Sequence, residues 1–216
     1  MDRFIFLGNF IKQFDEDKLT EEVNYLVDAC KHVAREGFTI CYEPIHDLLV
    51  YDMRLETKLT VGYNISKTYA NRSFLHNSKF FPELVKLTEL FGLNYDISYD
   101  DVGFVNNGVK IHMMVPGQMF PTHVDDIGYI SDVDDNSSIN DVVRIQVALK
   151  DWEFGQIANY GGFVYENWKA GDAFVFDWKT TQHYAVNAST EVRPFLQLTG
   201  IATEKTKEII SRGVGR

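Results

Sequence analysis

Three features are scarce in this sequence, and each scarcity excludes a class of protein. Cysteine occurs only as Cys30 and Cys41, whose spacing fits no metal-binding motif, so we expect two reduced thiols in a cytoplasmic protein. Lysine and arginine total 21 against 31 acidic residues, and the resulting net charge of −10 argues against binding to nucleic acid or to an anionic membrane. No stretch reaches the roughly 18–20 apolar residues that a membrane span requires.

What the chain does contain is material for a packed core. Hydrophobic residues make up 45% and aromatic residues 14% of the 216 positions, which is enough for one sizeable domain. No repeat, low-complexity tract or linker interrupts it. We therefore expect a single domain over 1–216, in which 1–100 supplies helices and flanking strands, 101–202 forms a β-rich core and 203–216 ends in a helix or tail.

Apolar residues recur at helical spacing in two segments. The first is 19–35, where Thr20 can cap the start, and the second is 81–93, where Gly92 can end the helix. A short C-terminal helix is predicted over 203–213.

The remaining periodic segments indicate β-strands separated by turns. Expected strands or hairpins lie at 38–44, 47–56, 59–65, 101–115 (turning at Asn107-Gly108), 141–151, 161–177 (turning at 168–172) and 182–201. Many short strands preceded by helices favour a mainly β fold with flanking helices, either a β-sandwich or an open barrel.

The sequence PTHVD places His123 and Asp125 two residues apart. In an extended segment both side chains project to the same face, where an imidazole and a carboxylate can hold one divalent metal ion. A surface histidine paired with an acid is the alternative, because such a triplet often occurs by chance.

A second pair, His183 and Arg193, strengthens the metal interpretation. If 183–195 forms a hairpin that turns about 187–190, His183 faces Arg193 across the strands, with Cβ atoms about 5 Å apart. Two histidines and one carboxylate are the ligands of non-haem Fe(II) oxygenases, and an arginine fork can bind a carboxylate through two hydrogen bonds.

These motifs resemble the 2-oxoglutarate- and Fe(II)-dependent oxygenases, and most of all the aspartyl/asparaginyl β-hydroxylase-like group. The matching text is VKIHMMVPGQMFPTHVD, VVRIQVALKD and WKAGDAFVFDWKTTQHYAVNASTEVRPFLQL, within 109–198. The resemblance implies a double-stranded β-helix, the distorted jelly roll of cupin-like proteins. It implies His123, Asp125 and His183 as Fe(II) ligands and Arg193 as the partner of the distal carboxylate of 2-oxoglutarate.

The activity implied is hydroxylation of an unactivated C–H bond, with O2 and 2-oxoglutarate as cosubstrates. The prime substrate would be a peptide or protein side chain, or an amino-acid-like small molecule. The rival interpretation is a cupin-like metal-binding protein, an isomerase or a sensor, without oxygenase activity. A structural barrel that binds neither iron nor 2-oxoglutarate is a second rival.

Four further residues are candidates for contact with the cosubstrate. Arg144 and Gln146 alternate on one face of a strand, in the region where similar proteins carry an Arg-x-His pair; a solvated arginine paired with the acidic segment is the alternative for Arg144. His112 and Met114 share a face that could border the same pocket, although His112 also fits a core-edge histidine bonded to backbone.

Two polar features have structural explanations. Asn187 fits a turn cap as well as a ligand contact. The acidic segment 126–141 is interpreted as a lid beside the iron or as a solvated insertion. It fails the calcium-loop pattern, because Ser137 replaces the required glycine and Val143 the required glutamate.

Overall fold

The computed structural model describes residues 4–36, 40–43, 48–54, 66–71, 81–95, 97–99, 108–125, 130–133 and 139–215, with side chains for 4–28, 81–95, 108–125 and 140–215. The second predicted turn residue, Gly108, is described, whereas Asn107 lies outside these residues. So do the predicted strand 59–65 and the side chains of both cysteines.

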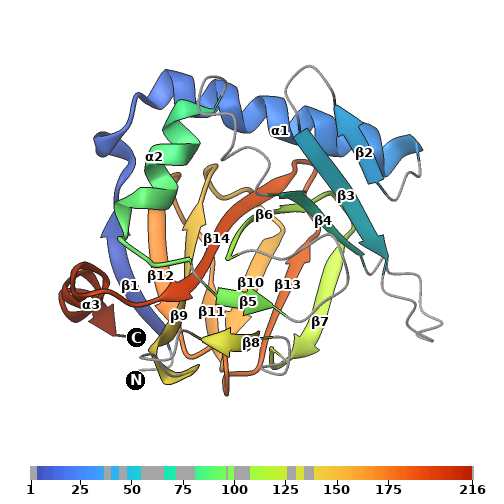
Figure 1. The fold of residues 1–216 in the computed structure, drawn as a ribbon. Helices are drawn as coiled ribbons and strands as arrows, with labels where there is room; N and C mark the ends of the chain where they lie inside the picture. The colour runs from blue at the N-terminus through green and yellow to red at the C-terminus, as the bar shows by residue number, and fades with distance from the viewer. Residues whose placement is uncertain are drawn as a thin grey trace.

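Two antiparallel sheets dominate the part of the chain that the structure describes (Figure 1). The larger has nine strands in the order β15 (Val214–Gly215), β1 (Phe4–Asn9), β12 (Asp172–Phe176), β9 (Val142–Ala148), β14 (Arg193–Ile201), β6 (Val109–Met114), β4 (Ser66–Asn71), β3 (Leu48–Arg54) and β2 (Ile40–Glu43). The smaller has four, in the order β11 (Phe163–Tyr165), β10 (Gln156–Tyr160), β13 (His183–Asn187) and β7 (Met119–His123). A separate pair joins β5 (Ile97–Tyr99) to β8 (Ile130–Val133).

The chain passes repeatedly from one sheet to the other. It runs through β6 in the larger sheet, β7 in the smaller, β9 in the larger, β10 and β11 in the smaller, β12 in the larger, β13 in the smaller and β14 in the larger. This alternation is that of a jelly roll, in which two sheets face each other. The protein is a double-stranded β-helix with flanking helices, as the resemblance implied.

Three α-helices lie within the described residues: α1 (Glu16–Glu36), α2 (Pro82–Leu90) and α3 (Glu204–Ser211). Two short 3-10 turns, η1 (Ile11–Gln13) and η3 (Ile139–Asp141), connect neighbouring elements. None of these helices has the length and apolar character needed to cross a bilayer.

The helix boundaries agree with the sequence patterns except at one start. Helix α1 begins at Glu16, so Thr20 lies inside it rather than capping it. The cap is Asp15, whose carboxylate accepts the Lys18 backbone N–H at 3.3 Å. Gly92 follows α2 with φ +66°, a conformation that favours glycine.

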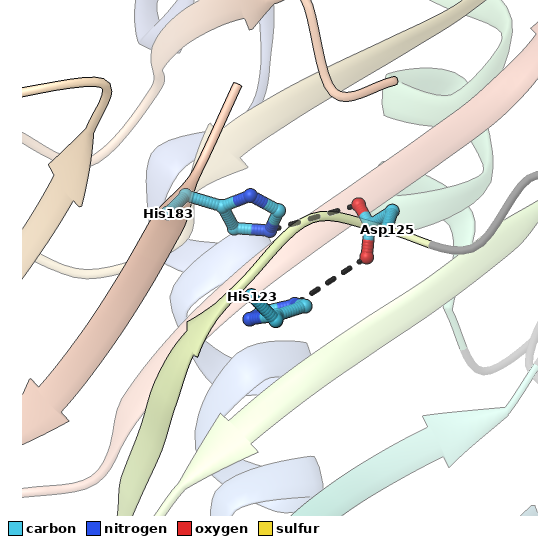
Figure 2. A group of neighbouring side chains, drawn as sticks. All are labelled: His123, Asp125 and His183. Carbon is cyan, nitrogen blue, oxygen red and sulfur yellow. Dashed lines mark ion pairs between the residues drawn. The ribbon is translucent and has the colours of Figure 1, made fainter. Parts of the chain in front are cut away.

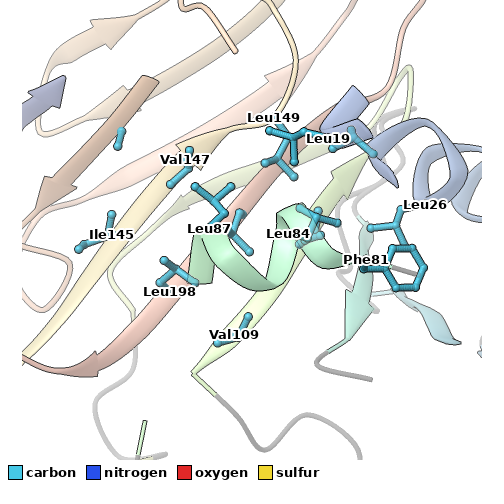
Figure 3. Close-up of a cluster of buried hydrophobic side chains, with 14 of the residues drawn as sticks. Leu19, Leu26, Phe81, Leu84, Leu87, Val109, Ile145, Val147, Leu149 and Leu198 are labelled. Carbon is cyan, nitrogen blue, oxygen red and sulfur yellow. The ribbon is translucent and has the colours of Figure 1, made fainter. Parts of the chain in front are cut away.

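Helices α1 and α2 cover the outer face of the larger sheet and bury a hydrophobic cluster against it (Figure 3). Strand β9 shows how the sequence directs this packing, because Val143, Ile145 and Val147 alternate toward the helices. Leu84 and Leu87 of α2 complete the contact and are almost fully buried.

A second, aromatic cluster fills the space between the two sheets. It includes Phe4, Tyr160, Phe174 and Phe195, together with Trp168, all at most 3% exposed. The rings pack in tilted and edge-to-face arrangements, such as Trp168 on Phe195 at 5.1 Å between centroids. The aromatic residues of 168–178 therefore belong to the core, and the metal candidates lie at its edge.

One strand pairing predicted from the sequence is wrong. Residues 182–201 do contain two strands, β13 and β14, but they belong to different sheets. The connecting residues 188–192 cross between the sheets, so no ladder joins His183 to Arg193. Strands β1, β4, β5, β7, β10 and β15 were not predicted, because their segments are short or lack a clear alternation of apolar and polar residues.

The acidic segment 126–141 contains strand β8 and the turn η3. Its remaining residues, 126–129 and 134–138, lie outside the described part, so the predicted lid is described only in part. The structure thus describes a strand within a segment that the sequence indicated only as a loop or insertion.

Gly171, in the turn before β12, lies against Ile11 of η1. It has φ +84°, and a Cβ there would lie 2.6 Å from the Ile11 nitrogen. We expect Gly171→Ala to lower the free energy of unfolding by at least about 2 kcal/mol, from positive-φ strain plus overpacking. Gly117→Ala is the matched control, because Gly117 has φ +82° but open space around it, and should cost only about 1 kcal/mol. Urea denaturation measures both; equal losses would contradict the close approach.

Candidate active site

Three predicted metal ligands converge at one end of the space between the sheets. His123 ends β7 and His183 begins β13, and these residues are direct partners in the antiparallel ladder. Their ring centroids lie 4.2 Å apart. Asp125 lies two residues beyond β7 and turns back toward both rings (Figure 2). One ligand atom from each of the three lies within 4.8 Å of the other two.

Backbone carbonyls orient both imidazoles in the same way. His123 Nδ1 lies 2.9 Å from the Pro121 carbonyl oxygen, and His183 Nδ1 lies 3.0 Å from that of Thr181. Each Nδ1–H can therefore donate to the carbonyl two residues upstream, which leaves the Nε2 lone pair free. The two Nε2 atoms face Asp125, at 3.4 Å from Oδ1 and 3.6 Å from Oδ2 respectively.

The charges of the site suit a divalent cation. Burial alone would raise the pKa of Asp125, but the Arg144 guanidinium and the two histidines together hold that pKa well below its usual range. Burial lowers the pKa of His183 to about 4, against the opposing effect of Asp125. At neutral pH the site therefore offers an ionised carboxylate and a neutral imidazole lone pair, the forms that bind metals.

These donors fit the metal that the resemblance implies. Two imidazole nitrogens and one carboxylate oxygen form the ligand set of non-haem Fe(II) centres, which leave further coordination positions open. His123, Asp125 and His183 are the residues that would hold the ion.

Arg193 lies on the inner face of β14 and is 4% exposed. Its guanidinium lies over the Phe195 ring at 4.2 Å and the Trp168 ring at 5.1 Å. Its Nε atom is buried without a hydrogen-bond partner, and no carboxylate in the described residues forms an ion pair with it. Burial lowers the pKa of Arg193, while Tyr160 and Tyr165 oppose that shift. The part of the site that the structure describes thus holds a buried cation without a carboxylate partner.

Tyr160 connects this cation to the metal candidates and was not identified from the sequence. It pairs with His183 in the β10–β13 ladder, and the two rings stack at 6.0 Å. Burial raises the pKa of Tyr160 to about 12, although the nearby Arg193 guanidinium opposes that shift, so the Tyr160 hydroxyl stays protonated. The signal that could have identified Tyr160 is a strand prediction over β10 (Gln156–Tyr160), for which the sequence pattern is weak.

Arg193 pairs with Met114 of β6, not with His183 as predicted. The physical reason is the change of sheet between β13 and β14, which puts Tyr160 and His123 beside His183 instead. Arg193 and His183 still meet the same interior space, through Tyr160.

The other cosubstrate candidates lie on the inner face of the larger sheet. Met114 is the ladder partner of Arg193, and His112 is that of Phe195, so both border the end that holds the unpaired guanidinium. Gln146 donates to Gln197 at 3.3 Å. These three positions are in the space between the sheets.

Arg144 is buried, which rules out the solvated alternative. It is 7% exposed and forms an ion pair with Asp125. Asn187, by contrast, has the structural role expected of a turn cap: it is fully buried, and its side-chain amide donates to the Met114 and Glu191 carbonyls at 2.7 Å each.

Comparisons with known proteins give similarity of structure but not of sequence. No family model and no curated protein matches the sequence. The chain is similar to the solved structure of EvdMO1, with 14% identity, a TM-score of 0.50, and coverage of 94% of this chain and 48% of that one. That similarity supports the jelly-roll fold alone.

Two further structures are similar at lower TM-scores. SnoK, described as a non-haem α-ketoglutarate-dependent carbocyclase from nogalamycin biosynthesis, has 13% identity and a TM-score of 0.47, with 85% of this chain and 75% of that one covered. A Pseudomonas putida prolyl-4-hydroxylase has 14% identity and a TM-score of 0.44, with 94% of each chain covered.

The buried, neutral His183 predicts a pH dependence of stability in the metal-free protein. Its folded-state pKa of about 4 lies below the usual 6.5, so between these values the unfolded chain binds a proton that the folded chain does not. Stability should therefore fall as the pH falls from 6.5 to 4, by at most roughly 3 kcal/mol from this residue. Urea denaturation at a series of pH values should give a flatter profile for His183→Gln; identical profiles would contradict the assignment.

Proposed function

We propose that this chain is an Fe(II)- and 2-oxoglutarate-dependent dioxygenase that hydroxylates an unactivated C–H bond. The observation that carries the proposal is a two-histidine, one-carboxylate cluster that Tyr160 separates from a buried arginine, for which the described residues supply no anionic partner. A cytoplasmic location, expected from the two cysteines, is part of the same proposal.

The buried Arg193 supports an organic anion as the second component. A guanidinium removed from water costs several kcal/mol unless an anion and hydrogen bonds compensate for it. The Phe195 and Trp168 rings contact the guanidinium, and Tyr160 supplies a neutral hydroxyl beside it. A carboxylate can accept hydrogen bonds from both the guanidinium edge and that hydroxyl.

2-Oxoglutarate has the chemistry that joins the two parts of the site. Its distal carboxylate would pair with Arg193 and Tyr160, and its keto acid end would reach the metal held by His123, Asp125 and His183. With Fe(II), 2-oxoglutarate and O2 bound, the centre would supply an oxidant strong enough for an unactivated C–H bond. The chain's own contribution is to orient the cosubstrate and to keep water out, through the aromatic cluster between the sheets.

The rival cupin-like metal protein without oxygenase activity gives Arg193 no role. For the prime substrate we propose a peptide or protein side chain, or an amino-acid-like small molecule. That choice, like membership of the aspartyl/asparaginyl β-hydroxylase-like group, rests on the sequence resemblance alone.

The deciding experiment is anaerobic reconstitution of the metal-free protein with Fe(II) and then 2-oxoglutarate. We expect a metal-to-ligand charge-transfer absorption and, on admission of O2, formation of succinate. Asp125→Ala and His183→Ala should abolish both signals because each removes a ligand, whereas Glu208→Ala, on the exposed face of α3, should keep them. Full succinate formation by either ligand variant would remove that residue from the ligand set.

Arg193→Lys tests the anion site separately from the metal. Lysine keeps the charge but loses the planar fork, and one hydrogen bond to a charged group contributes about 1.5–3 kcal/mol. We therefore expect the Kd for 2-oxoglutarate, titrated at saturating Mn(II), to rise at least about tenfold, which corresponds to about 1.4 kcal/mol. An unchanged Kd would show that another group binds the cosubstrate.

A further inference from the structure

Arg144 is held on three sides at the metal end of the site. Its Nε donates to Thr199 Oγ1 at 3.0 Å, and its Nη1 donates to Asp125 Oδ2. Its guanidinium carbon lies 4.3 Å from the centroid of the Trp178 ring. Arg144 and Thr199 are direct partners in the β9–β14 ladder, and Trp178 is 2% exposed. The guanidinium therefore has a rigid strand on one side and a buried aromatic platform on another.

The Asp125 carboxylate needs such a partner. It lies beyond the end of β7, and its side chain is 18% exposed. Each of its oxygens faces a different imidazole, Oδ1 toward His123 and Oδ2 toward His183 (Figure 2). Rotation about the bond to the carboxylate would exchange or misdirect these oxygens. The hydrogen bond from Arg144 to Oδ2 fixes that rotation.

We infer that Arg144 is a positioning residue that orients Asp125 toward the metal and thereby sets the affinity of the three-ligand site. This inference rests on the proposed function, because it assumes that His123, Asp125 and His183 bind a metal. This role differs from the one that the sequence suggested for Arg144, which was contact with the cosubstrate. In the structure, Arg144 Nε donates to Thr199 and Arg144 Nη1 donates to Asp125.

The inference predicts separate effects on metal and on cosubstrate. Arg144→Met keeps an unbranched side chain against Trp178 but removes both donors. Removing a group that orients a metal ligand typically costs 10–100-fold in affinity, so we expect the Mn(II) Kd of the metal-free protein to rise by about that factor. The Kd for 2-oxoglutarate, measured at saturating Mn(II), should stay as in the unsubstituted protein. Isothermal titration calorimetry gives both values.

Two further variants keep the test decisive. Thr199→Val removes only the Nε acceptor and should weaken Mn(II) binding by less than Arg144→Met does. Arg212→Met is the matched control, because Arg212 is an exposed arginine of the C-terminal region whose ion pair with Glu208 is far from these contacts in the chain; it should change neither Kd. Thermal unfolding followed by circular dichroism confirms that each variant is folded.

The outcomes separate the inference from the proposed function. Unchanged Mn(II) affinity in folded Arg144→Met overturns the inference. If 2-oxoglutarate binding is weakened in that same variant, Arg144 is a cosubstrate ligand instead. If Arg144→Met does not fold, unchanged Mn(II) affinity in Thr199→Val overturns it. Equal Mn(II) binding by His183→Ala and the unsubstituted protein would instead remove the metal site and, with it, the proposed function.

Discussion

The antiparallel pairing of β7 with β13 is the constraint on which the candidate site depends. It sets His123 directly opposite His183, and it brings the end of β7 close enough for Asp125 to face both rings. Backbone hydrogen bonds fix the other end of the pair, since Asn187 bonds to Gly117 at 2.8 Å and to Gln118 at 2.9 Å. A shift of one residue in this register would turn one imidazole to the opposite face of the sheet and dismantle the cluster.

Two buried arginines give the interior its electrostatic character, and they differ in how their charge is compensated. Arg144 lies against Asp125, so cation and carboxylate neutralise each other beside the two histidines. Arg193 has aromatic rings and a tyrosine hydroxyl around it but no carboxylate among the described residues. One arginine thus completes a protein ion pair, while the charge of the other is not compensated by any carboxylate that the structure describes.

The helices make this polar interior compatible with a stable fold. Because α1 and α2 bury the outer face of the larger sheet, strand β14 is covered on both faces and all of its residues are buried. Its outward residues, such as Leu196 and Leu198, supply apolar packing. Its inward residues, Arg193 and Thr199, can therefore serve the space between the sheets. The residues of β14 that stabilise the fold by apolar packing therefore lie on one face of the strand, and those that contribute to the candidate site lie on the other.

The sequence by itself determined the local geometry of this protein. Helical periodicity located α1 and α2, and the turn-cap role of Asn187 could be predicted without coordinates. His123 and Asp125 do face each other as predicted, but Asp125 lies beyond the end of β7 and not within the strand. Only the tertiary structure decided which residues are neighbours. The hairpin rule that paired His183 with Arg193 failed because the chain changes sheets between them. Tyr160 lies beside His183, and Arg144 beside Asp125, because their strands pack there although they are remote in sequence. Spacing along a strand fixes the face on which a side chain lies, whereas the strand beside it is selected by hydrogen bonding and packing over the whole fold.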